Sequence, residues 1–230
     1  MPLPSLLLFA RSPQPGRAKT RLAGRLTEEG AARLYGAFLA DAARVYGDPE
    51  RWRSVLCADS DPADARLAEL FGPPWARERQ SPGDLGERLA AAFAAEFERG
   101  APAAVAVGSD HPSLPRRRLV EVFDALASGC DAAVIPAEDG GYCAIGLTPL
   151  APARDLFRGI AWSTEAVLRE TLARLDSGGV RYRLLDAGYD VDRPEDLERL
   201  AGDLAGRDPS ADDFPRETAR LLAALTGAAR

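Results

Sequence analysis

The chain has 230 residues, a formal net charge of −6 at pH 7, 46% hydrophobic residues and 28% charged residues. This composition is typical of a soluble globular protein, and the length suits one large α/β domain or two small ones. A protein that coats nucleic acid usually has a basic excess, so the acidic balance argues against nucleic acid as a partner. The apolar run at residues 3–9 has no basic segment before it and Arg11 follows closely, which indicates a buried strand rather than a signal peptide or a membrane span.

The cysteine and histidine content narrows the chemistry further. Cys57, Cys130 and Cys143 are scattered, with neither zinc-ligand spacing nor a disulfide framework, which predicts a reducing, cytoplasmic location. His111 is the only histidine, so sites built from several histidine ligands are excluded. A Ser-His-Asp triad would have to use His111, and no G-x-S-x-G sequence accompanies it.

Short apolar runs alternate with longer amphipathic segments along the chain. The apolar runs predict strands at 6–9, 54–57, 104–107, 132–135 and 182–185. Helical periodicity predicts helices at about 27–46, 62–71, 84–99, 115–128, 163–175 and 194–204. Because the strands are continuously apolar, both faces of the sheet should be covered. The rhythm predicts a three-layer α/β/α fold with a mostly parallel sheet.

Two later segments depart from this rhythm. Residues 140–147 form a glycine-flanked extended segment, which we expect as an antiparallel insertion beside the sheet. Residues 205–213 predict a polar turn, and residues 214–225 one last amphipathic helix. We expect residues 1–204 to form a single domain, with residues 205–230 packed on it.

The first predicted strand is followed by a basic stretch, Arg11-Ser12-Pro13-Gln14-Pro15-Gly16-Arg17-Ala18-Lys19-Thr20-Arg21-Leu22. Ligands of open α/β sheets bind beyond the carboxyl ends of the strands, which is where this stretch lies. It is not a Walker phosphate loop, because the first glycine is missing and Pro13 and Pro15 remove amide donors. A looser phosphate-binding turn and a solvated basic turn both stay open.

Lys19 is the only lysine among the 29 basic residues. Arginine presents a wide planar fork, whereas lysine carries a compact charge that reaches a single oxygen. Lys19 therefore indicates a confined site in which a guanidinium does not fit, with mutational chance as the alternative.

Acidic residues follow the later strands. Asp110, after the strand at 104–107, is placed either to bind a divalent cation or to cap the next helix with Ser113. The Asp139-Gly140-Gly141 segment permits close backbone approach, and an ordinary hairpin turn would use the same residues. Asp190 and Asp192 lie on one side of a short strand, with helix capping by Asp192 as the alternative. Together with the basic stretch, these carboxylates suit a phosphate–metal–carboxylate arrangement.

Six motifs occur in an order that resembles a bacterial family: "FARSPQPGRAKTRL", "DLGERLAAAF", "GSDHPSL", "DGGYCAIGL", "FRGIAWST" and "YDVDRPEDL". This is the DUF2064 family of transferases, which has a glycosyltransferase-A (nucleotide-diphospho-sugar transferase) fold. The fold is similar to that of sugar-nucleotide transferases and small-molecule nucleotidyltransferases. The resemblance spans roughly residues 5–200 and implies that residues 1–204 are a nucleotide-binding transferase domain.

The resemblance also implies roles for individual residues. The implied catalytic residues are Lys19, Asp110 and Asp139, and the implied metal ligands are Asp110 and Asp192. The implied nucleotide-binding residues are Arg11, Gly16, Arg17, Lys19, Arg21, Arg88 and Ser109. The implied acceptor-binding residues are Gly140, Gly141, Trp162 and Ser163. Arg11 stands where many members have lysine, and Gly108 stands where a glycosyltransferase D-x-D motif has its first aspartate.

These features favour a metal-dependent glycosyltransferase that uses Mg²⁺ or Mn²⁺ to move a sugar from a nucleotide-sugar donor to a small acceptor. A nucleotidyltransferase that takes a nucleoside triphosphate and a small phosphorylated acceptor is the alternative, and the incomplete D-x-D favours it. A non-catalytic nucleotide-binding protein is a third interpretation. We expect neither nucleic acid nor a membrane as a partner.

Overall fold

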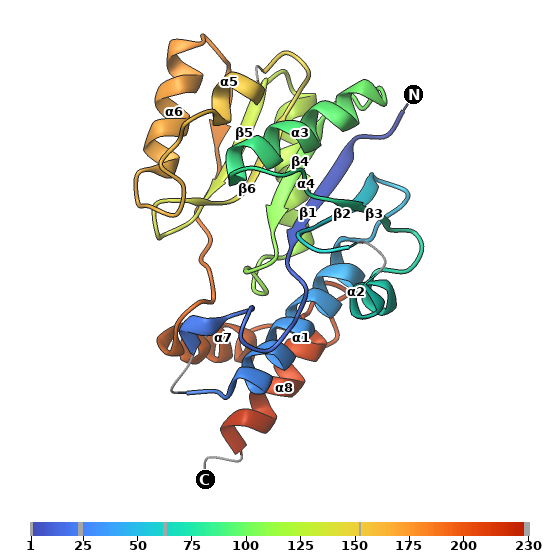
Figure 1. Cartoon of the computed structure of the whole chain (residues 1–230), viewed down its shortest axis with the longest axis vertical. Helices are drawn as coiled ribbons and strands as arrows, with labels where there is room; N and C mark the ends of the chain where they lie inside the picture. The colour runs from blue at the N-terminus through green and yellow to red at the C-terminus, as the bar shows by residue number, and fades with distance from the viewer. Residues whose placement is uncertain (1, 23–24, 62–63, 152, 228–230) are drawn as a thin grey trace.

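The computed structural model describes residues 2–22, 25–61, 64–151 and 153–227, and its centre is a seven-stranded sheet (Figure 1). The strand order is β3-β2-β1-β4-β6-β5-β7. β6 is antiparallel to both of its neighbours, and the other pairs are parallel. The strands are β1 (Ser5–Ala10), β2 (Arg53–Ala58), β3 (Ala76–Arg79), β4 (Ala104–Gly108), β5 (Ala132–Pro136), β6 (Tyr142–Leu147) and β7 (Tyr182–Leu184). The predicted α/β fold with a mostly parallel sheet is confirmed.

Helices cover both faces of this sheet. They are α1 (Glu28–Tyr46), α2 (Ala65–Leu70), α3 (Leu85–Glu98), α4 (Arg116–Ala127), α5 (Ala153–Phe157), α6 (Val167–Ser177), α7 (Pro194–Ala205) and α8 (Arg216–Gly227), with a 3-10 turn η1 (Thr20–Leu22). Local chemistry fixes where several of them begin. Thr27 accepts a hydrogen bond from the Gly30 amide at the start of α1, and Asp84 and Glu87 form a capping box at the start of α3.

Alternate residues of each central strand face two separate hydrophobic cores. In β1, Leu6 and Leu8 belong to the core that also contains Phe38 of α1, whereas Leu7 belongs to the core of Phe93 in α3. The first core also receives α4, α7 and α8, and the second receives α5 and α6. This double burial explains why the strands are continuously apolar in sequence.

The segment at 140–147 corrects one expectation. Its strand, β6, lies inside the sheet between β4 and β5 rather than beside the sheet. Gly146 permits this position, because a Cβ there would lie 2.5 Å from Val122 Cγ1 of α4 and 3.1 Å from Val105 Cγ2 of β4. The sequence prediction also missed β3 and α5, which have four and five residues, too few for a clear periodicity.

The remaining helices agree with the predicted ranges to within three residues at either end, apart from α6, which begins four residues late, after a turn and bend at residues 162–166. The first two residues of the helix predicted at 62–71 lie outside the described residues, as do residues 228–230 of the chain end. α8 packs on α1, where the buried Asp41 carboxylate accepts hydrogen bonds from the Glu217 and Thr218 amides at 3.1 and 2.8 Å. Among the described helices, none is long and apolar enough to cross a lipid bilayer.

Gly146→Val should test the close approach of α4 to β6. We expect a loss of about 1–3 kcal/mol in the free energy of unfolding, because the added methyl groups overpack this contact. Gly202→Ala in α7 is the matched control, since nothing lies within 4 Å of its added Cβ. It should gain roughly 0.5–1 kcal/mol from the reduced entropy of the unfolded chain. Urea denaturation measures both, and equal stability of the two variants would contradict the prediction.

Candidate functional site

The basic stretch after β1 forms a turn that buries its lysine and leaves an arginine outside. The Lys19 side chain is 3% exposed, whereas that of Arg21 is 69% exposed. Lys19 adopts φ +53°, a left-handed conformation that few residues with a Cβ adopt. Its Nζ lies 6.0 and 5.7 Å from the ring centroids of Tyr35 and Phe38. A wholly solvated basic turn therefore does not describe this segment.

The Lys19 ammonium joins two carboxylates from distant parts of the chain. Its Nζ lies 2.6 Å from Asp110 Oδ1, just after β4, and 2.8 Å from Asp192 Oδ1, just before α7. The two aspartate side chains are 45% and 38% exposed, so they face both the buried ammonium and solvent. Burial alone would lower the pKa of Lys19, but the two carboxylates raise it above its ordinary value. The pair is thus a cation-holding site at the carboxyl edge of the sheet.

Neither of these carboxylates caps a helix, so the capping alternatives are wrong. α4 begins after Pro115 without a side-chain cap. At α7 the cap is Asp196, whose Oδ2 accepts from the backbone amides of Asp192 and Arg193 at 2.9 and 2.7 Å. Asp110 and Asp192 instead pair with the Lys19 ammonium.

A second polar cluster lies beside this pair. Nδ1 of the buried His111 lies 2.9 Å from Oδ1 of Asp190, which is partly exposed. Burial opposes ionisation of both groups, but their mutual contact raises the pKa of His111 and lowers that of Asp190. Burial raises the pKa of Asp139, and the negative charge of Asp190 adds to that rise. A carboxyl group with a raised pKa is suited to accept a proton.

The Asp139-Gly140-Gly141 segment is both a hairpin turn and a point of close backbone approach. It joins β5 to β6, and Asp139 Oδ1 accepts from the Gly141 amide at 2.9 Å. Gly140 has φ +89°, and a Cβ there would lie 2.4 Å from the Glu165 carbonyl oxygen. The Leu168 amide donates to the Gly140 carbonyl oxygen at 2.8 Å. The turn is therefore fixed against the start of α6.

The two other predicted acceptor residues precede α6. Ser163 has φ +63°, a second left-handed residue with a side chain. The Trp162 ring packs edge-on against Tyr142, with 6.4 Å between centroids. Its Nε1 would lie 2.8 Å from a Cβ at Gly86, so it rests on the first turn of α3. The structure thus places Trp162 between the β6 hairpin and α3.

The remaining predicted nucleotide-binding residues divide into exposed and internally bonded ones. The side chains of Arg11 and Arg17 are exposed, and Gly16, immediately before Arg17, has φ +72°. Arg88 donates to Gln80 Oε1 at 3.2 Å and to the Gly83 carbonyl oxygen at 2.9 Å, which braces the loop after β3.

Ser109 is turned inward, and its partner was missed in the sequence. Ser109 Oγ lies 2.7 Å from the Tyr35 hydroxyl, which also accepts from the Arg11 amide at 3.0 Å. Tyr35 therefore ties the loop after β1 to the loop after β4. Its sequence signal is a helical apolar position in α1, which does not distinguish this role from ordinary packing. His111 and Asp190 are neighbours of Asp110 and Asp192 in the sequence, but no sequence pattern indicates that they contact each other.

The donor set at Lys19 bears on the predicted metal. Across the described parts of the chain, no three His, Cys, Asp or Glu side chains form a group that could hold a metal ion by themselves. A metal ion that takes its other ligands from water and substrate needs fewer protein ligands than three, and two carboxylates can supply them. Mg²⁺ is commonly held by one or two carboxylates, with water and substrate phosphates as the other ligands. Asp110 and Asp192 fit that pattern.

Comparison with solved structures shows which proteins share this fold. A Desulfovibrio desulfuricans G20 protein, assigned provisionally as a nucleotide-diphospho-sugar transferase, has 28% identity and a TM-score of 0.85 over 98% of this chain and 99% of its own. A cytidylyltransferase from Leptospira borgpetersenii has 14% identity and a TM-score of 0.58 over 100% of this chain and 95% of its own. An Anaerococcus prevotii 4-diphosphocytidyl-2C-methyl-D-erythritol synthase has 11% identity and a TM-score of 0.54, over 89% and 96%.

The chain therefore has the fold of nucleotide-dependent transferases along its whole length. Residues 42–164 match the model of the DUF2064 family, described as an uncharacterized protein conserved in bacteria. The match covers more than half of the chain, and the protein belongs to this family. Comparison with curated proteins gives no match.

The shared ammonium predicts non-additive effects of its two carboxylates on stability. Asp110→Asn or Asp192→Asn alone should cost about 1 kcal/mol or less, because Lys19 keeps one partly exposed partner. Both together should cost roughly 3–5 kcal/mol, because the buried ammonium then lacks a counter-charge. Adding Lys19→Met to the double variant should restore most of the loss, since it removes the unpaired charge. Denaturant unfolding measures all four, and simple additivity would refute the shared-ammonium model.

Proposed function

We propose that the protein is a metal-dependent glycosyltransferase that moves a sugar from a nucleotide-diphospho-sugar to a small acceptor. The observation that carries the proposal is the cation-holding pair of Asp110 and Asp192 beside the basic turn after β1. The likeness to the Desulfovibrio protein over nearly all of both chains supports the sugar-nucleotide donor. Positive charge at a strand end suits a diphosphate, and paired carboxylates suit its counter-ion.

Asp110 and Asp192 would hold Mg²⁺ or Mn²⁺ in this enzyme. When bound, such an ion neutralises the diphosphate leaving group as the bond to the sugar breaks. An ammonium has three donors, and the two carboxylates accept two of those of Lys19. Lys19 would offer the third to a phosphate oxygen, and the exposed side chains of Arg17 and Arg21 would contact the outer phosphate oxygens.

Asp139 would act on the acceptor side. Its raised pKa suits a general base that accepts the proton of the acceptor hydroxyl as the new glycosidic bond forms. The turn at Gly140 and Gly141, together with Trp162 and Ser163, would form the wall against which the acceptor lies. A planar indole and backbone amides suit a small polar acceptor with an apolar face.

A nucleotidyltransferase is the second candidate. The cytidylyltransferase likeness over the whole chain and the glycine at position 108, in place of the first aspartate of D-x-D, favour it. In that reaction the acceptor phosphate attacks the α-phosphate of a nucleoside triphosphate and pyrophosphate leaves. The two proposals therefore differ in the product that is released.

The decisive experiment measures that product. The enzyme, Mg²⁺ or Mn²⁺, a panel of sugar nucleotides and sugar or polyol acceptors should release nucleoside diphosphate. Asp110→Asn is the control, and its turnover should fall by orders of magnitude with little change in melting temperature, since Asp192 still pairs with Lys19. Release of pyrophosphate from a nucleoside triphosphate would replace the first proposal with the second. Turnover of either kind would exclude a non-catalytic nucleotide-binding protein.

Lys19 allows a sharper test of phosphate binding. Lys19→Ala should weaken nucleotide binding by roughly ten- to a hundredfold, as expected for the loss of a charge-assisted hydrogen bond of about 1.5–3 kcal/mol. Lys19→Arg should recover only part of this, because a guanidinium is too wide for the space between the two carboxylates and the rings of Tyr35 and Phe38. Titration with the best-binding nucleotide at fixed Mg²⁺ and salt measures both. Full affinity in Lys19→Arg would make the lone lysine a compositional accident.

A further inference from the structure

We propose that Arg199 of α7 is a positioning residue that fixes the distance between the two halves of the candidate site. Together with Glu138 and Tyr189 it forms what we call the Arg199 clamp. Through this clamp it would hold the turn that carries Asp139 against the segment that carries Asp190 and Asp192. The inference rests on the proposed function, since Arg199 would act only by positioning the residues that bind the metal and accept the proton in that reaction.

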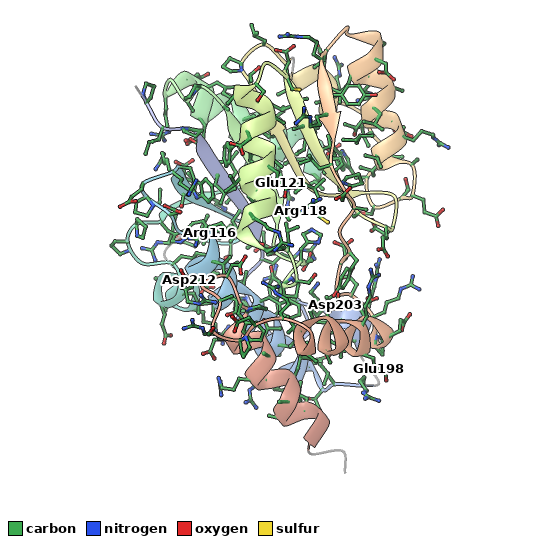
Figure 2. All side chains as sticks on the ribbon, turned by 180° about the vertical axis from the view of Figure 1, so that it is seen from behind. Arg116, Arg118, Glu121, Glu198, Asp203 and Asp212 are labelled. Atoms are coloured by element: carbon green, nitrogen blue, oxygen red, sulfur yellow. The ribbon has the colours of Figure 1, made fainter. Side chains whose placement is uncertain are left out.

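The clamp is a forked ion pair stacked on an aromatic ring. Arg199 Nη1 and Nη2 donate to Glu138 Oε2 and Oε1 at 2.6 and 2.7 Å. The guanidinium carbon lies 3.8 Å from the Tyr189 ring centroid. The Tyr189 hydroxyl donates to Asp203 Oδ2 at 2.6 Å, one turn further along α7; Asp203 is labelled in Figure 2. A planar guanidinium that is both forked and stacked has little freedom to rotate.

Both partners of Arg199 are next to candidate site residues in the sequence. Glu138 precedes Asp139, and Tyr189 precedes Asp190. A change in the clamp therefore acts on two carboxylates that lie on different segments. The contact joins two segments whose relative position sets the distance between the proposed proton acceptor and the proposed cation site.

Among the described residues, backbone hydrogen bonds hold the two segments together only as far as Gly188. The two segments pair as far as Gly188, whose amide donates to the Pro136 carbonyl oxygen and whose carbonyl accepts from the Glu138 amide. Beyond Gly188, the described backbone hydrogen bonds of this segment lead to the Asp110 carbonyl oxygen instead, through the amide of Val191. After Gly188 the segment no longer pairs with the β5–β6 turn, and it reaches α7 as an extended connection (Figure 1). Arg199, in α7 after this connection, makes a side-chain contact with Glu138 and so links α7 to the β5–β6 turn.

Stability alone gives little reason for this contact. The side chains of Arg199 and Glu138 are 45% and 53% exposed, and exposed ion pairs contribute little to folding. The chain contains a second ion pair, away from the site, in which an exposed arginine also contacts a carboxylate through two nitrogens. Arg181 bonds Asp131 with two nitrogens at 3.1 and 3.4 Å, at the start of β7 and β5, the opposite edge of the sheet from the candidate site. Comparing variants of the two pairs therefore distinguishes a positioning effect from a general effect of removing a surface charge.

The test compares Arg199→Ala, Glu138→Ala, their double variant and Arg181→Ala in the transfer assay. Arg199→Ala should lower kcat by roughly ten- to a hundredfold, as expected for a displaced catalytic group, with KM for the sugar nucleotide changed by less than about twofold. The double variant should fall no further than the worse single variant, since both act through one contact. Arg199→Lys should retain only part of kcat, because it keeps the charge without the fork or the stacking. Arg181→Ala should match the wild type in kcat.

A second readout does not depend on turnover. Hydrogen exchange should show faster amide exchange at residues 138–141 and 188–192 in Arg199→Ala and not in Arg181→Ala, with similar melting temperatures. Faster exchange in a protein that turns over no nucleotide would keep the clamp while the proposed function fails. Wild-type exchange and kcat in Arg199→Ala would overturn the clamp, and so would equal losses in Arg199→Ala and Arg181→Ala.

Discussion

One buried ammonium organises the carboxyl edge of this sheet. Lys19 brings together Asp110 and Asp192, which come from the end of β4 and the approach to α7. Two carboxylates so close would repel each other without a cation, and a buried ammonium would be costly without a counter-charge. The ammonium therefore offsets the repulsion between the carboxylates, and the carboxylates offset the cost of burying the ammonium. As a result, three segments that are distant in sequence meet at one nitrogen atom.

The same edge separates two kinds of polar chemistry. Lys19, Asp110 and Asp192 form a site that holds a cation, and His111, Asp190 and Asp139 form a row beside it in which one carboxyl is held with a raised pKa. Burial raises the pKa of Asp139, whereas the contact with His111 lowers that of Asp190, so the two neighbouring carboxyl groups are shifted in opposite directions. Only one residue, Val191, separates Asp190 from Asp192, so a small shift of this segment would disturb both sets of contacts.

Much of the fold could be predicted because its signals are local. Short apolar runs identified five of the seven strands, and four of these, β1, β2, β4 and β5, are buried on both faces. The position of β6 could not be predicted in this way. Its place between β4 and β5 depends on Gly146 facing Val122 of α4, a contact that leaves no pattern within the strand itself. Likewise, helix propensity favoured Asp192 as a cap, whereas Asp196, four residues later, satisfies the amides.

The sequence by itself determined that this is an α/β protein with basic residues after its first strand and acidic residues after later ones, and its motifs placed it in its family. It singled out Lys19 by composition alone. Only the tertiary structure decided which charge meets which: that Lys19 lies between Asp110 and Asp192, that Asp190 turns to His111, and that Arg199 reaches back to Glu138. The physical reason is that periodicity and capping act over a few residues, whereas these contacts join positions 61 to 173 residues apart and depend on strand order and packing.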